Sequence, residues 1–278
     1  APAMNVRMWE HQSTKENIAK LKTYDYEIIG PTIGDMACGE YGEGKMTEPE
    51  NIINIIIKYF ENLSKNKKLT ALVTAGPTHE MIDPVRFISN KSSGKQGYEI
   101  ANSLKNNGFE TTLISGPTNL SPTNGINFIK VNTAEDMLNK CLECLPVDIA
   151  IFTAAVADYR VKKIHNQKIK KQEKLKLDLE QNVDILKHVS NHNSLRPKLV
   201  IGFAAETNNL RENSIKKLLE KNCDWIISNN VSNPEIGFNS ENNKVSIFYK
   251  NKVEENLPKM SKSAIANEIV NKIISDFN

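Results

Sequence analysis

A long loop between a strand-like run and a helix-like run holds several residues suited to binding an anion. Residues 72–101 have the sequence LVTAGPTHEMIDPVRFISNKSSGKQGYEIA, in which Gly76 ends the first apolar run. Small residues precede the helical periodicity over 98–107: Ser92, Ser93, Gly94 and Gly97. Such a turn at a helix N-terminus presents backbone N–H groups and the positive end of the helix dipole. The loop therefore predicts a phosphate site.

The loop fits neither common phosphate-binding pattern. Gln96 follows Gly94 and Lys95, and Ser89 stands where the pattern G-x-x-x-x-G-K-[ST] requires its first glycine. The dinucleotide pattern G-x-G-x-x-G is also absent from the chain. An alternative interpretation, which the residues leave open, is that these glycines serve only the shape of the backbone.

Three further segments carry polar residues near the ends of strand-like runs. TAAVADYR (153–160) combines small residues with Asp158, whose carboxylate could accept hydrogen bonds from hydroxyl groups. KIKK (168–171) could direct two ammonium groups at a polyphosphate. GFAAETNN (202–209) precedes Lys217 and Lys221, which share one helical face. The alternatives are ordinary strand–helix packing, a solvated charged hairpin and a surface lysine pair.

Apolar runs alternate between strand-like and helix-like patterns. The predicted strands are 69–75, 110–115, 126–131, 148–155, 199–204 and 225–228, and the predicted helices are 98–107, 134–145, 183–191 and 210–222. Thr133, with Asp136 three residues later, predicts a capped helix start. This alternation favours an α/β fold, a Rossmann-like, doubly wound, mostly parallel sheet with helices on both faces. Ligands bind such sheets outside the carboxyl ends of the strands.

Two segments depart from the alternation. Residues 1–65 form a separate, loop-rich part with a helix near 50–63, and 62–68 is a polar linker. The second domain is therefore expected over 66–278. Residues 160–179 are strongly basic, and LKLDL (175–179) alternates like an exposed strand, which predicts a protruding flap or hairpin. Residues 244–250 predict one more strand and 261–277 a closing helix.

Composition bounds the class of protein. The 278 residues are 39% hydrophobic and 25% charged, and the net charge of +3 predicts no nucleic-acid partner. Four cysteines give no secreted disulfide framework, which favours a cytoplasmic protein, and Cys141 and Cys144 fit plain helix positions better than a metal site. The apolar runs are too short to span a membrane. The chain lacks an initiator Met and is expected to begin inside a longer protein or after processing.

Four motifs in order resemble phosphopantothenoylcysteine synthetase, the ligase half of a bacterial bifunctional coenzyme A biosynthesis protein. They are AGPTHEMIDPVRFISNKSSGKQG (75–97), AAVADYR, KIKK and GFAAETNN, and the resemblance covers about residues 67–277. The resemblance implies a two-step reaction on 4′-phosphopantothenate, CTP and L-cysteine through an acyl-cytidylate. It also implies Mg²⁺, which we expect the CTP phosphates to hold, since the sequence identifies no metal ligands.

Residue roles follow from the same resemblance. Asn90 matches the residue that stabilises the acyl-cytidylate, and Lys168 matches a flap lysine that serves the triphosphate and the second step. The nucleotide-binding positions implied are Gly76, Ser92, Ser93, Gly94, Gly97, Thr153, Ala154, Ala155, Asp158, Asn182, Asp184, Ile185, Phe203, Lys217 and Lys221. Val183 stands where the family has proline, so the backbone at residue 183 is less restricted than in the family. Gln96 stands where methionine is common.

The front of the chain resembles the tail of the flavin-dependent phosphopantothenoylcysteine decarboxylase. The matching stretches are PAMNVRMW (2–9) and ACGEYGEGKM (37–46). By this resemblance Asn5 binds substrate and Cys38 is the proton donor, with FMN as cofactor of the decarboxylase half. The decarboxylase's N-terminal portion is not in this sequence, so decarboxylation by this chain alone is not expected.

Two other classes of protein compete with a ligase. An NAD(P)-dependent oxidoreductase is disfavoured because no G-x-G-x-x-G opens the first helix. A scaffold whose flap binds nucleic acid is disfavoured by the modest net charge. The resemblance further implies a homodimer through the synthetase domain, and a larger homo-oligomer where the full decarboxylase domain is present.

Overall fold

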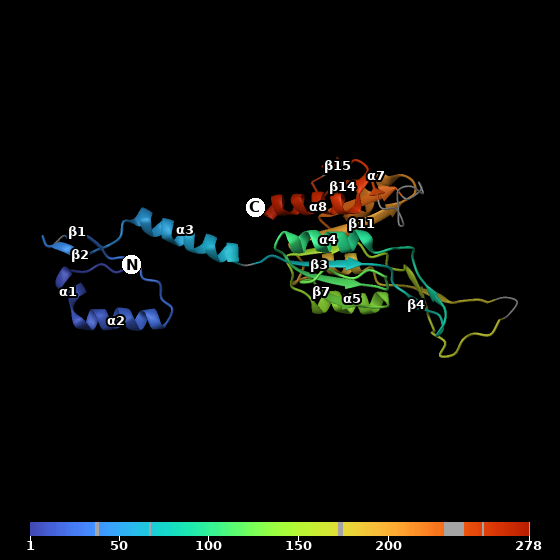
Figure 1. Cartoon of the computed structure of the whole chain (residues 1–278), viewed down its shortest axis with the longest axis horizontal. Helices are drawn as coiled ribbons and strands as arrows, with labels where there is room; N and C mark the ends of the chain where they lie inside the picture. The colour runs from blue at the N-terminus through green and yellow to red at the C-terminus, as the bar shows by residue number, and fades with distance from the viewer. Residues whose placement is uncertain (37–38, 67, 172–174, 231–241, 252, 278) are drawn as a thin grey trace. The chain divides into compact units, whose positions relative to one another are not determined.

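The chain divides into two compact units in a computed structural model (Figure 1). The structure describes residues 1–36, 39–66, 68–171, 175–230, 242–251 and 253–277. The first unit comprises Ala1–Lys67 and the second comprises Lys68–Asn278. No helix in the described part of the chain is long and apolar enough to cross a membrane.

The first unit consists of three helices and one hairpin in its described residues. In order these are α1 (Val6–Glu10), α2 (Gln12–Thr23), β1 (Thr32–Asp35), β2 (Tyr41–Lys45) and α3 (Pro49–Asn66). Among residues 1–36 and 39–60, only Pro31, Gly44 and Thr47 are buried. The boundary between the two units falls within the predicted linker over 62–68, and α3 continues into that segment as far as Asn66. The polar residues there include no Gly or Pro to end a helix.

An eight-stranded sheet forms the centre of the second unit. Its order is β15-β14-β12-β11-β8-β3-β6-β7. The strands are β3 (Thr70–Ala75), β6 (Glu110–Ser115), β7 (Asn127–Lys130), β8 (Ile149–Phe152), β11 (Leu199–Glu206), β12 (Trp225–Asn230), β14 (Val245–Tyr249) and β15 (Glu254–Asn256). The six from β7 to β12 pair in parallel, while β14 and β15 are antiparallel. The first strand of this sheet is β3, and the next two strands, β6 and β7, are added on one side of it. The chain then crosses to the other side of β3 to form β8, so the topological switch point lies between β3 and β8.

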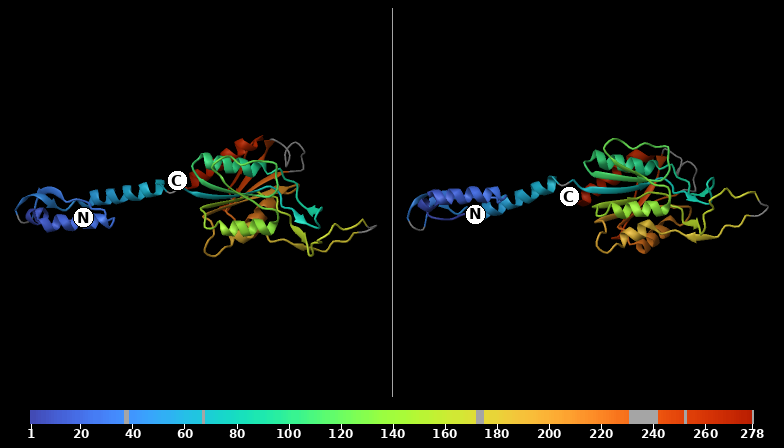
Figure 2. Two further views of the ribbon diagram at one scale, coloured as in Figure 1. Left: turned by 60° about the horizontal axis from the view of Figure 1, so that its bottom comes forward. Right: turned by 90° about the horizontal axis from the view of Figure 1, so that it is seen from below.

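Helices cover both faces of this sheet, as the two views in Figure 2 show. Helices α4 (Lys95–Asn106) and α8 (Lys262–Phe277) pack on one face, and α5 (Ala134–Glu143), α6 (Ile185–Ser190) and α7 (Leu210–Lys221) pack on the other. Strand residues alternate between the two cores: Val73 faces α4 and α8, whereas Leu72 faces α5 and α6. Sheets buried on both faces need continuously apolar strands, and this chain has them. The predicted fold class is confirmed.

Several predicted boundaries were wrong by a few residues. Helix α4 begins at Lys95 rather than residue 98, because Gly94 turns the backbone with φ 76° and the helix starts directly after it. Helix α6 begins only at Ile185, because the Asp184 carboxylate caps it by accepting from Lys187 N at 2.9 Å. Strand β8 ends at Phe152, three residues early, and β11 extends to Glu206, which the sequence had placed beyond the strand.

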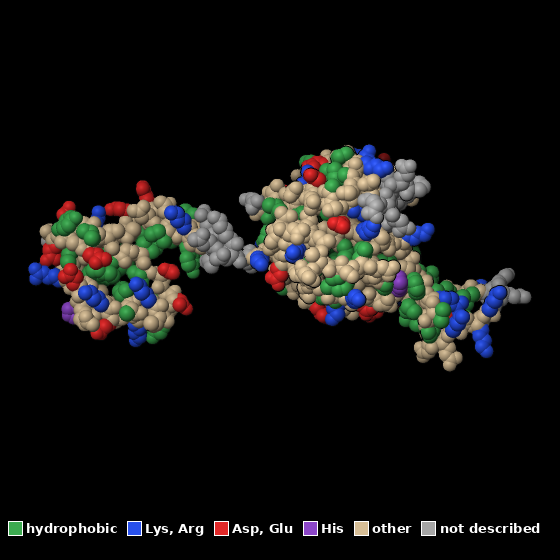
Figure 3. All heavy atoms as spheres, viewed as in Figure 1, with side chains coloured by type: hydrophobic (Ala, Val, Ile, Leu, Met, Phe, Trp, Pro, Cys, Tyr) green, Lys and Arg blue, Asp and Glu red, His purple; other side chains and the backbone are tan. Residues whose placement is uncertain are grey.

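Two small hairpins project beyond the carboxyl ends of the strands. The first pairs β4 (Glu80–Met81) with β5 (Phe87–Ile88), and the second pairs β9 (Tyr159–Val161) with β10 (Leu179–Gln181). Residues 162–171 and 175–178, the described residues between β9 and β10, belong to the predicted flap, and Figure 3 shows Lys and Arg side chains gathered on this projecting part. Of LKLDL, only Leu179 belongs to a strand, so the strand prediction over 175–178 was wrong. Alternation alone does not supply a pairing partner.

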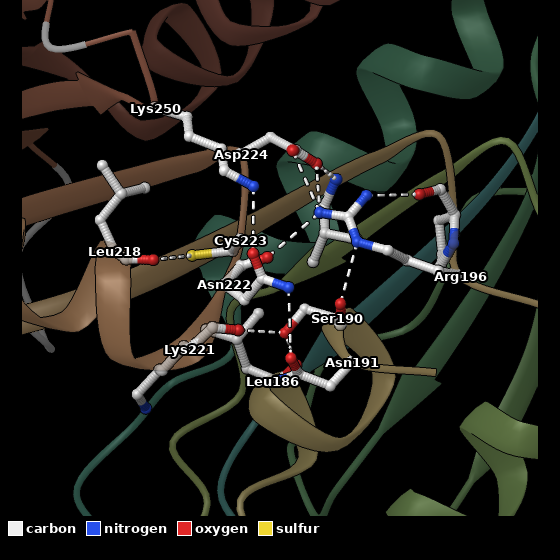
Figure 4. Close-up of polar contacts among 12 residues, drawn as sticks. Leu186, Ser190, Asn191, Arg196, Leu218, Lys221, Asn222, Cys223, Asp224 and Lys250 are labelled. Atoms are coloured by element: carbon white, nitrogen blue, oxygen red, sulfur yellow. Dashed lines mark hydrogen bonds and ion pairs between the residues drawn. The ribbon is translucent and has the colours of Figure 1, made fainter. Parts of the chain in front are cut away.

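A polar cluster ties the opposite end of the sheet together (Figure 4). The Arg196 guanidinium donates to Ser190 O at 2.9 Å and to Asn222 O at 3.1 Å, and its Nη2 contacts both Asp224 carboxylate oxygens at 3.0 Å. Asp224 in turn accepts from Val200 N at 2.8 Å. These contacts join the ends of α6 and α7 to the starts of β11 and β12. They lie away from the carboxyl ends of the strands and are therefore structural.

Candidate nucleotide site

A cavity of about 640 Å³ opens where the carboxyl ends of the strands meet the first helix of the fold. It lies beyond β3 and β8, at the switch point where α/β sheets bind ligands. Its walls contain most of the residues predicted from sequence: Asn90, Ser92, Ser93, Gly94, Gly97, Thr153, Ala154, Ala155, Asp158, Asn182, Asp184, Ile185, Phe203, Lys217 and Lys221. Residues up to 131 positions apart in the sequence thus line one hollow, from Asn90 to Lys221.

Three glycines, of which Gly94 and Gly97 line the cavity, shape the backbone at its wall. Gly76 and Gly94 have φ of 72° and 76°, a left-handed conformation that favours glycine. A Cβ added to Gly94 would lie 3.4 Å from the Cα of Gly76, so the two backbones touch across the loop that separates them in sequence. A Cβ on Gly97 would lie 2.4 Å from Thr153 Oγ1 and 2.6 Å from Ala75 Cβ. Gly97 therefore lets α4 approach the ends of β3 and β8.

The start of α4 lies at the cavity, where the sequence predicts an anion site. Gly94 is its N-cap residue, Gly94 N donates to Ser92 Oγ at 3.2 Å, and Gly97 N donates to Gly94 O at 3.0 Å. Lys95 and Gln96 of the first turn line the cavity, near the positive end of the helix dipole. Gly76 supports this turn from behind without lining the cavity itself.

Backbone from 153 to 155 forms a second wall. Thr153 N donates to Thr74 O at 3.2 Å, Ala154 N to Thr74 Oγ1 at 3.4 Å, and Ala155 N to Gly76 O at 2.9 Å. Because these N–H groups have acceptors within the protein, the backbone groups that Thr153 and Ala154 could offer to a ligand are their carbonyl oxygens, whereas Ala155 already pairs with Pro77 in a parallel bridge. Carbonyl oxygens accept hydrogen bonds, so the segment suits a donor such as an exocyclic amine.

Lysines give the cavity a positive charge. Lys91, Lys95, Lys217, Lys221 and Lys262 line it, against the two aspartates Asp158 and Asp184. Lys217 Nζ lies 2.6 Å from Glu206 Oε1, and Lys221 Nζ lies 3.0 Å from Asp184 Oδ2. These ion pairs hold both α7 lysines in the wall at i,i+4 spacing, as predicted. A concave surface with excess positive charge attracts anions.

Asn90 and Lys168 have different positions relative to the cavity. Asn90 lies in its wall, and its Nδ2 donates to Val156 O at 2.8 Å, which orients the side chain. Lys168 is exposed on the flap and is not among the residues that line the cavity. The structure therefore groups Asn90 with the nucleotide residues and leaves Lys168 on a separate, projecting segment.

The sequence did not identify Lys262, Asn229 or Asn243, which also line the cavity. Lys262 is only 6% exposed and Asn243 only 5%. Gln96 Nε2 donates to the Lys262 carbonyl at 3.3 Å, which connects α4 to the start of α8. One signal in the sequence could have identified Lys262. A lysine at the first position of a helix is unfavourable because its charge opposes the helix dipole, which indicates that the lysine has a role other than stabilising the helix.

The decarboxylase residues predicted from sequence belong to the first unit. Asn5 is the N-cap residue of α1, accepting from Arg7 N at 2.8 Å, and its side chain also donates to Glu40. Cys38 lies outside the described residues. The residues described in this unit therefore test neither role.

The fold is an α/β fold of the Rossmann type, with a lysine-lined cavity at the carboxyl ends of its strands. Residues 66–277 match the family described as DNA/pantothenate metabolism flavoprotein C-terminal domain, and residues 1–61 match the flavoprotein family. The chain is 41% identical over 279 residues to the coenzyme A biosynthesis bifunctional protein CoaBC of Haemophilus influenzae, covering 100% of this chain and 69% of that protein. It is 41% identical over 278 residues to the Bacillus subtilis protein of the same name, covering 98% of this chain and 68% of that one.

A solved structure gives the same result. The crystal structure of the C-terminal domain of a coenzyme A biosynthesis bifunctional protein CoaBC superposes with a TM-score of 0.63 at 41% identity, covering 74% of this chain and 93% of that one. The chain therefore belongs to the family of bifunctional proteins of coenzyme A biosynthesis.

Proposed function

We propose that the second unit joins 4′-phosphopantothenate to L-cysteine at the expense of CTP. One observation carries this proposal: a single lysine-lined cavity at the switch point of the sheet gathers three of the four sequence motifs. Such a cavity suits a nucleoside triphosphate. The relatives' name, coenzyme A biosynthesis bifunctional protein, supports the pathway.

In the first step, a carboxylate oxygen of 4′-phosphopantothenate attacks the α-phosphorus of CTP. The new P–O bond forms as the bond to the β-phosphate oxygen breaks, giving an acyl-cytidylate and pyrophosphate. Catalysis of this kind depends on positioning and on neutralising charge. The N–H groups at the start of α4 and the α7 lysines Lys217 and Lys221 are the groups we assign to the phosphates.

In the second step, the cysteine amine attacks the acyl carbon. The C–N bond forms, the bond from that carbon to the phosphate oxygen breaks, and CMP leaves with the oxygen while the amine loses a proton to solvent. We assign Asn90 to the acyl-cytidylate, because its side-chain amide lies in the cavity wall, oriented by Val156 O at 2.8 Å. Lys168 is assigned to this step from the flap.

The described residues contain no group of three His, Cys, Asp or Glu that could hold a metal ion. The polar side chains that line the cavity are lysines, amides and the carboxylates of Asp158 and Asp184. We therefore propose that Mg²⁺ is held mainly through phosphate oxygens, as hard cations prefer. When bound, it would neutralise phosphate charge.

Base choice follows from the occupied N–H groups of Thr153, Ala154 and Ala155. The carbonyl oxygens of Thr153 and Ala154 would accept from the N4 amino group of cytosine and would face the O4 acceptor of uracil. We therefore expect UTP to be used much less well than CTP, because a buried acceptor opposite another acceptor leaves both unpaired.

The test is to measure CMP and pyrophosphate formation with purified protein. CMP should form only when CTP, 4′-phosphopantothenate and cysteine are all present, and pyrophosphate exchange should need only CTP and 4′-phosphopantothenate. A well-folded sample that turns over no CTP would contradict the proposal. The NAD(P) alternative is tested in parallel by titration with NADPH.

The second activity implied by the relatives is decarboxylation with FMN. Residues 1–61 match the flavoprotein family, so we propose that they serve that half, with Asn5 at the substrate and Cys38 as proton donor. The described residues of this unit bury almost no side chains. A flavin absorbance spectrum after purification tests whether this chain retains the cofactor.

The proposed homodimer is a separate matter. Size measurement in solution tests it directly, and a mass that fits only a monomer would contradict it.

A further inference from the structure

The flap is fastened to the β4–β5 hairpin at two points. His165 N donates to Ile82 O at 3.0 Å, and Ile169 N donates to Asp83 Oδ2 at 3.1 Å. Between residues 162 and 171, Ile169 is the only residue that is not exposed. A flap attached only through β9 and β10 would leave its lysines free to sample many positions. These two contacts restrict the positions that the flap can adopt.

Asp83 is the centre of the fastening. Its residue is fully buried, at 0% exposure, although it carries a carboxylate. Oδ1 accepts from Val85 N at 2.9 Å and Arg86 N at 3.0 Å, which closes the hairpin turn. Oδ2 faces the flap and accepts from Ile169 N. The two oxygens therefore join the hairpin to the flap.

Arg86 completes the contact from the other side. Its Nε donates to Asp83 Oδ2 at 2.9 Å, and its Nη2 contacts the same oxygen and donates to Ile169 O at 2.8 Å. The hydrogen bond from Arg86, opposed by burial, holds the pKa of Asp83 well below its usual range. The Asp83 carboxylate therefore stays ionised near neutral pH.

These contacts fix the backbone beside Lys168. Ile169 N belongs to the peptide group that Ile169 shares with Lys168, and Ile169 O belongs to the next peptide group. Both peptide groups that flank Ile169 are thus held, and the first of them is that of Lys168. The same hairpin leads two residues later to Asn90, and Glu80 at its start accepts from Ala134 N at 2.8 Å, which anchors it to α5.

We propose that Asp83 and Arg86 are positioning residues that set the location of Lys168 relative to Asn90 through the backbone of Ile169. This proposal rests on the proposed function, which gives Lys168 its part in amide formation. The β4–β5 hairpin then positions both Asn90, which follows it in sequence, and Lys168, whose backbone it holds through Asp83 and Arg86.

The main test uses Arg86→Gln in the full chain. The Arg86 side chain is 37% exposed, and in this variant Asp83 can still accept from the two hairpin N–H groups, so the fold should survive. Lys163→Gln is the matched control, because it removes a flap charge without touching the fastening. Asp83→Asn is a second variant, which replaces the central carboxylate by an amide of the same size.

Three measurements separate positioning from general damage. Hydrogen exchange over residues 162–171 should quicken about tenfold or more in Arg86→Gln and stay unchanged in Lys163→Gln. Amide formation should fall by about 100-fold, and pyrophosphate exchange, which uses Lys168 only at the triphosphate, should fall by a smaller factor. In the Lys168→Gln background, adding Arg86→Gln should produce no further loss, because the positioned group is already gone.

Three results would overturn the proposal: amide formation that is unchanged or faster in Arg86→Gln, an equal loss in the Lys168→Gln background, or unchanged exchange of the flap. Failure of the proposed function itself is recognisable, because the wild-type chain would then turn over no CTP. In that case hydrogen exchange alone still decides the fastening: faster exchange in Arg86→Gln supports it and unchanged exchange overturns it.

Discussion

Asn90 has a side chain that lies in the cavity wall and is oriented by a backbone acceptor. Asn90→Asp would replace the donor to Val156 O with an oxygen, at 2.8 Å from another oxygen, and add a negative charge beside the phosphates. We expect amide formation to fall by about 100-fold, since a misplaced or repelled reacting group costs about this much. Single-turnover measurement of the acyl-cytidylate and of CMP checks this. Wild-type rates in the variant would refute the role.

Lys262 is the buried lysine that the sequence did not identify. We expect Lys262→Gln to weaken CTP binding by about tenfold, the loss of one charge-assisted hydrogen bond. Isothermal titration with CTP measures this, and Lys259→Gln, an exposed neighbour that does not line the cavity, is the control. Equal affinities for the two variants would exclude Lys262 from the site.

At the scale of elements, Gly97 sets the distance between α4 and the ends of β3 and β8. Gly97→Ala would force atoms to 2.4 Å from Thr153 Oγ1, so the helix must shift away from the sheet. Overpacking of this kind costs about 2 kcal/mol of unfolding free energy. CTP affinity should fall as well, because the anion site moves with α4. Chemical denaturation and CTP titration check both effects, with Glu99→Ala on the same helix as control.

Asp148 ties the starts of β3 and β8 together. It accepts from Thr70 N and Thr70 Oγ1 at 3.0 Å and pairs with Lys198 Nζ at 2.9 Å. Burial opposes its ionisation, but the hydrogen bonds from Thr70 and the pairing with Lys198 outweigh burial and lower the pKa of Asp148. A lowered folded-state pKa means that its stabilisation is present above the unfolded pKa of about 4 and is lost as pH falls through the folded pKa.

Asp148→Asn should therefore be less stable than wild type at pH 7, and the difference should shrink as pH falls below about 4. Urea denaturation at several pH values measures this difference. Asp276→Asn, on the exposed face of α8, serves as the control. A difference that stays constant with pH would show that Asp148 acts through packing and not through its charge.

At the scale of the whole molecule, the two units differ in how much core each has. The second unit buries apolar side chains on both faces of its sheet, whereas the described residues of the first bury almost none. We therefore expect residues 68–278 expressed alone to unfold cooperatively and to retain CMP formation. Circular dichroism melting and the CMP assay test this. An inactive but folded fragment would mean that the first unit contributes to the site.

The sequence by itself determined the fold class and the order of most elements, and it predicted an anion site at the start of α4. Period-two and period-3.6 apolar patterns are local properties, and the strands and helices of the second unit follow them. The capping box at Thr133 and Asp136 is present as predicted, with Asp136 N donating to Thr133 Oγ1 at 3.1 Å. Boundaries were less accurate where a single cap decided them, as Gly94 and Asp184 did.

Only the tertiary structure decided which residues share the cavity. Gly94 and Gly97 have the spacing of the last two glycines of a dinucleotide-binding turn, but Gly76 lies 18 residues before Gly94 in sequence. Folding returns the chain so that Gly76 touches Gly94, and residues 77–93 project between them with the β4–β5 hairpin. A pattern along the chain cannot register such a contact, because it depends on the path of the inserted segment. The same holds for Lys262 and for the Asp83–Arg86 fastening, whose partners are distant in sequence and adjacent only after the sheet has formed.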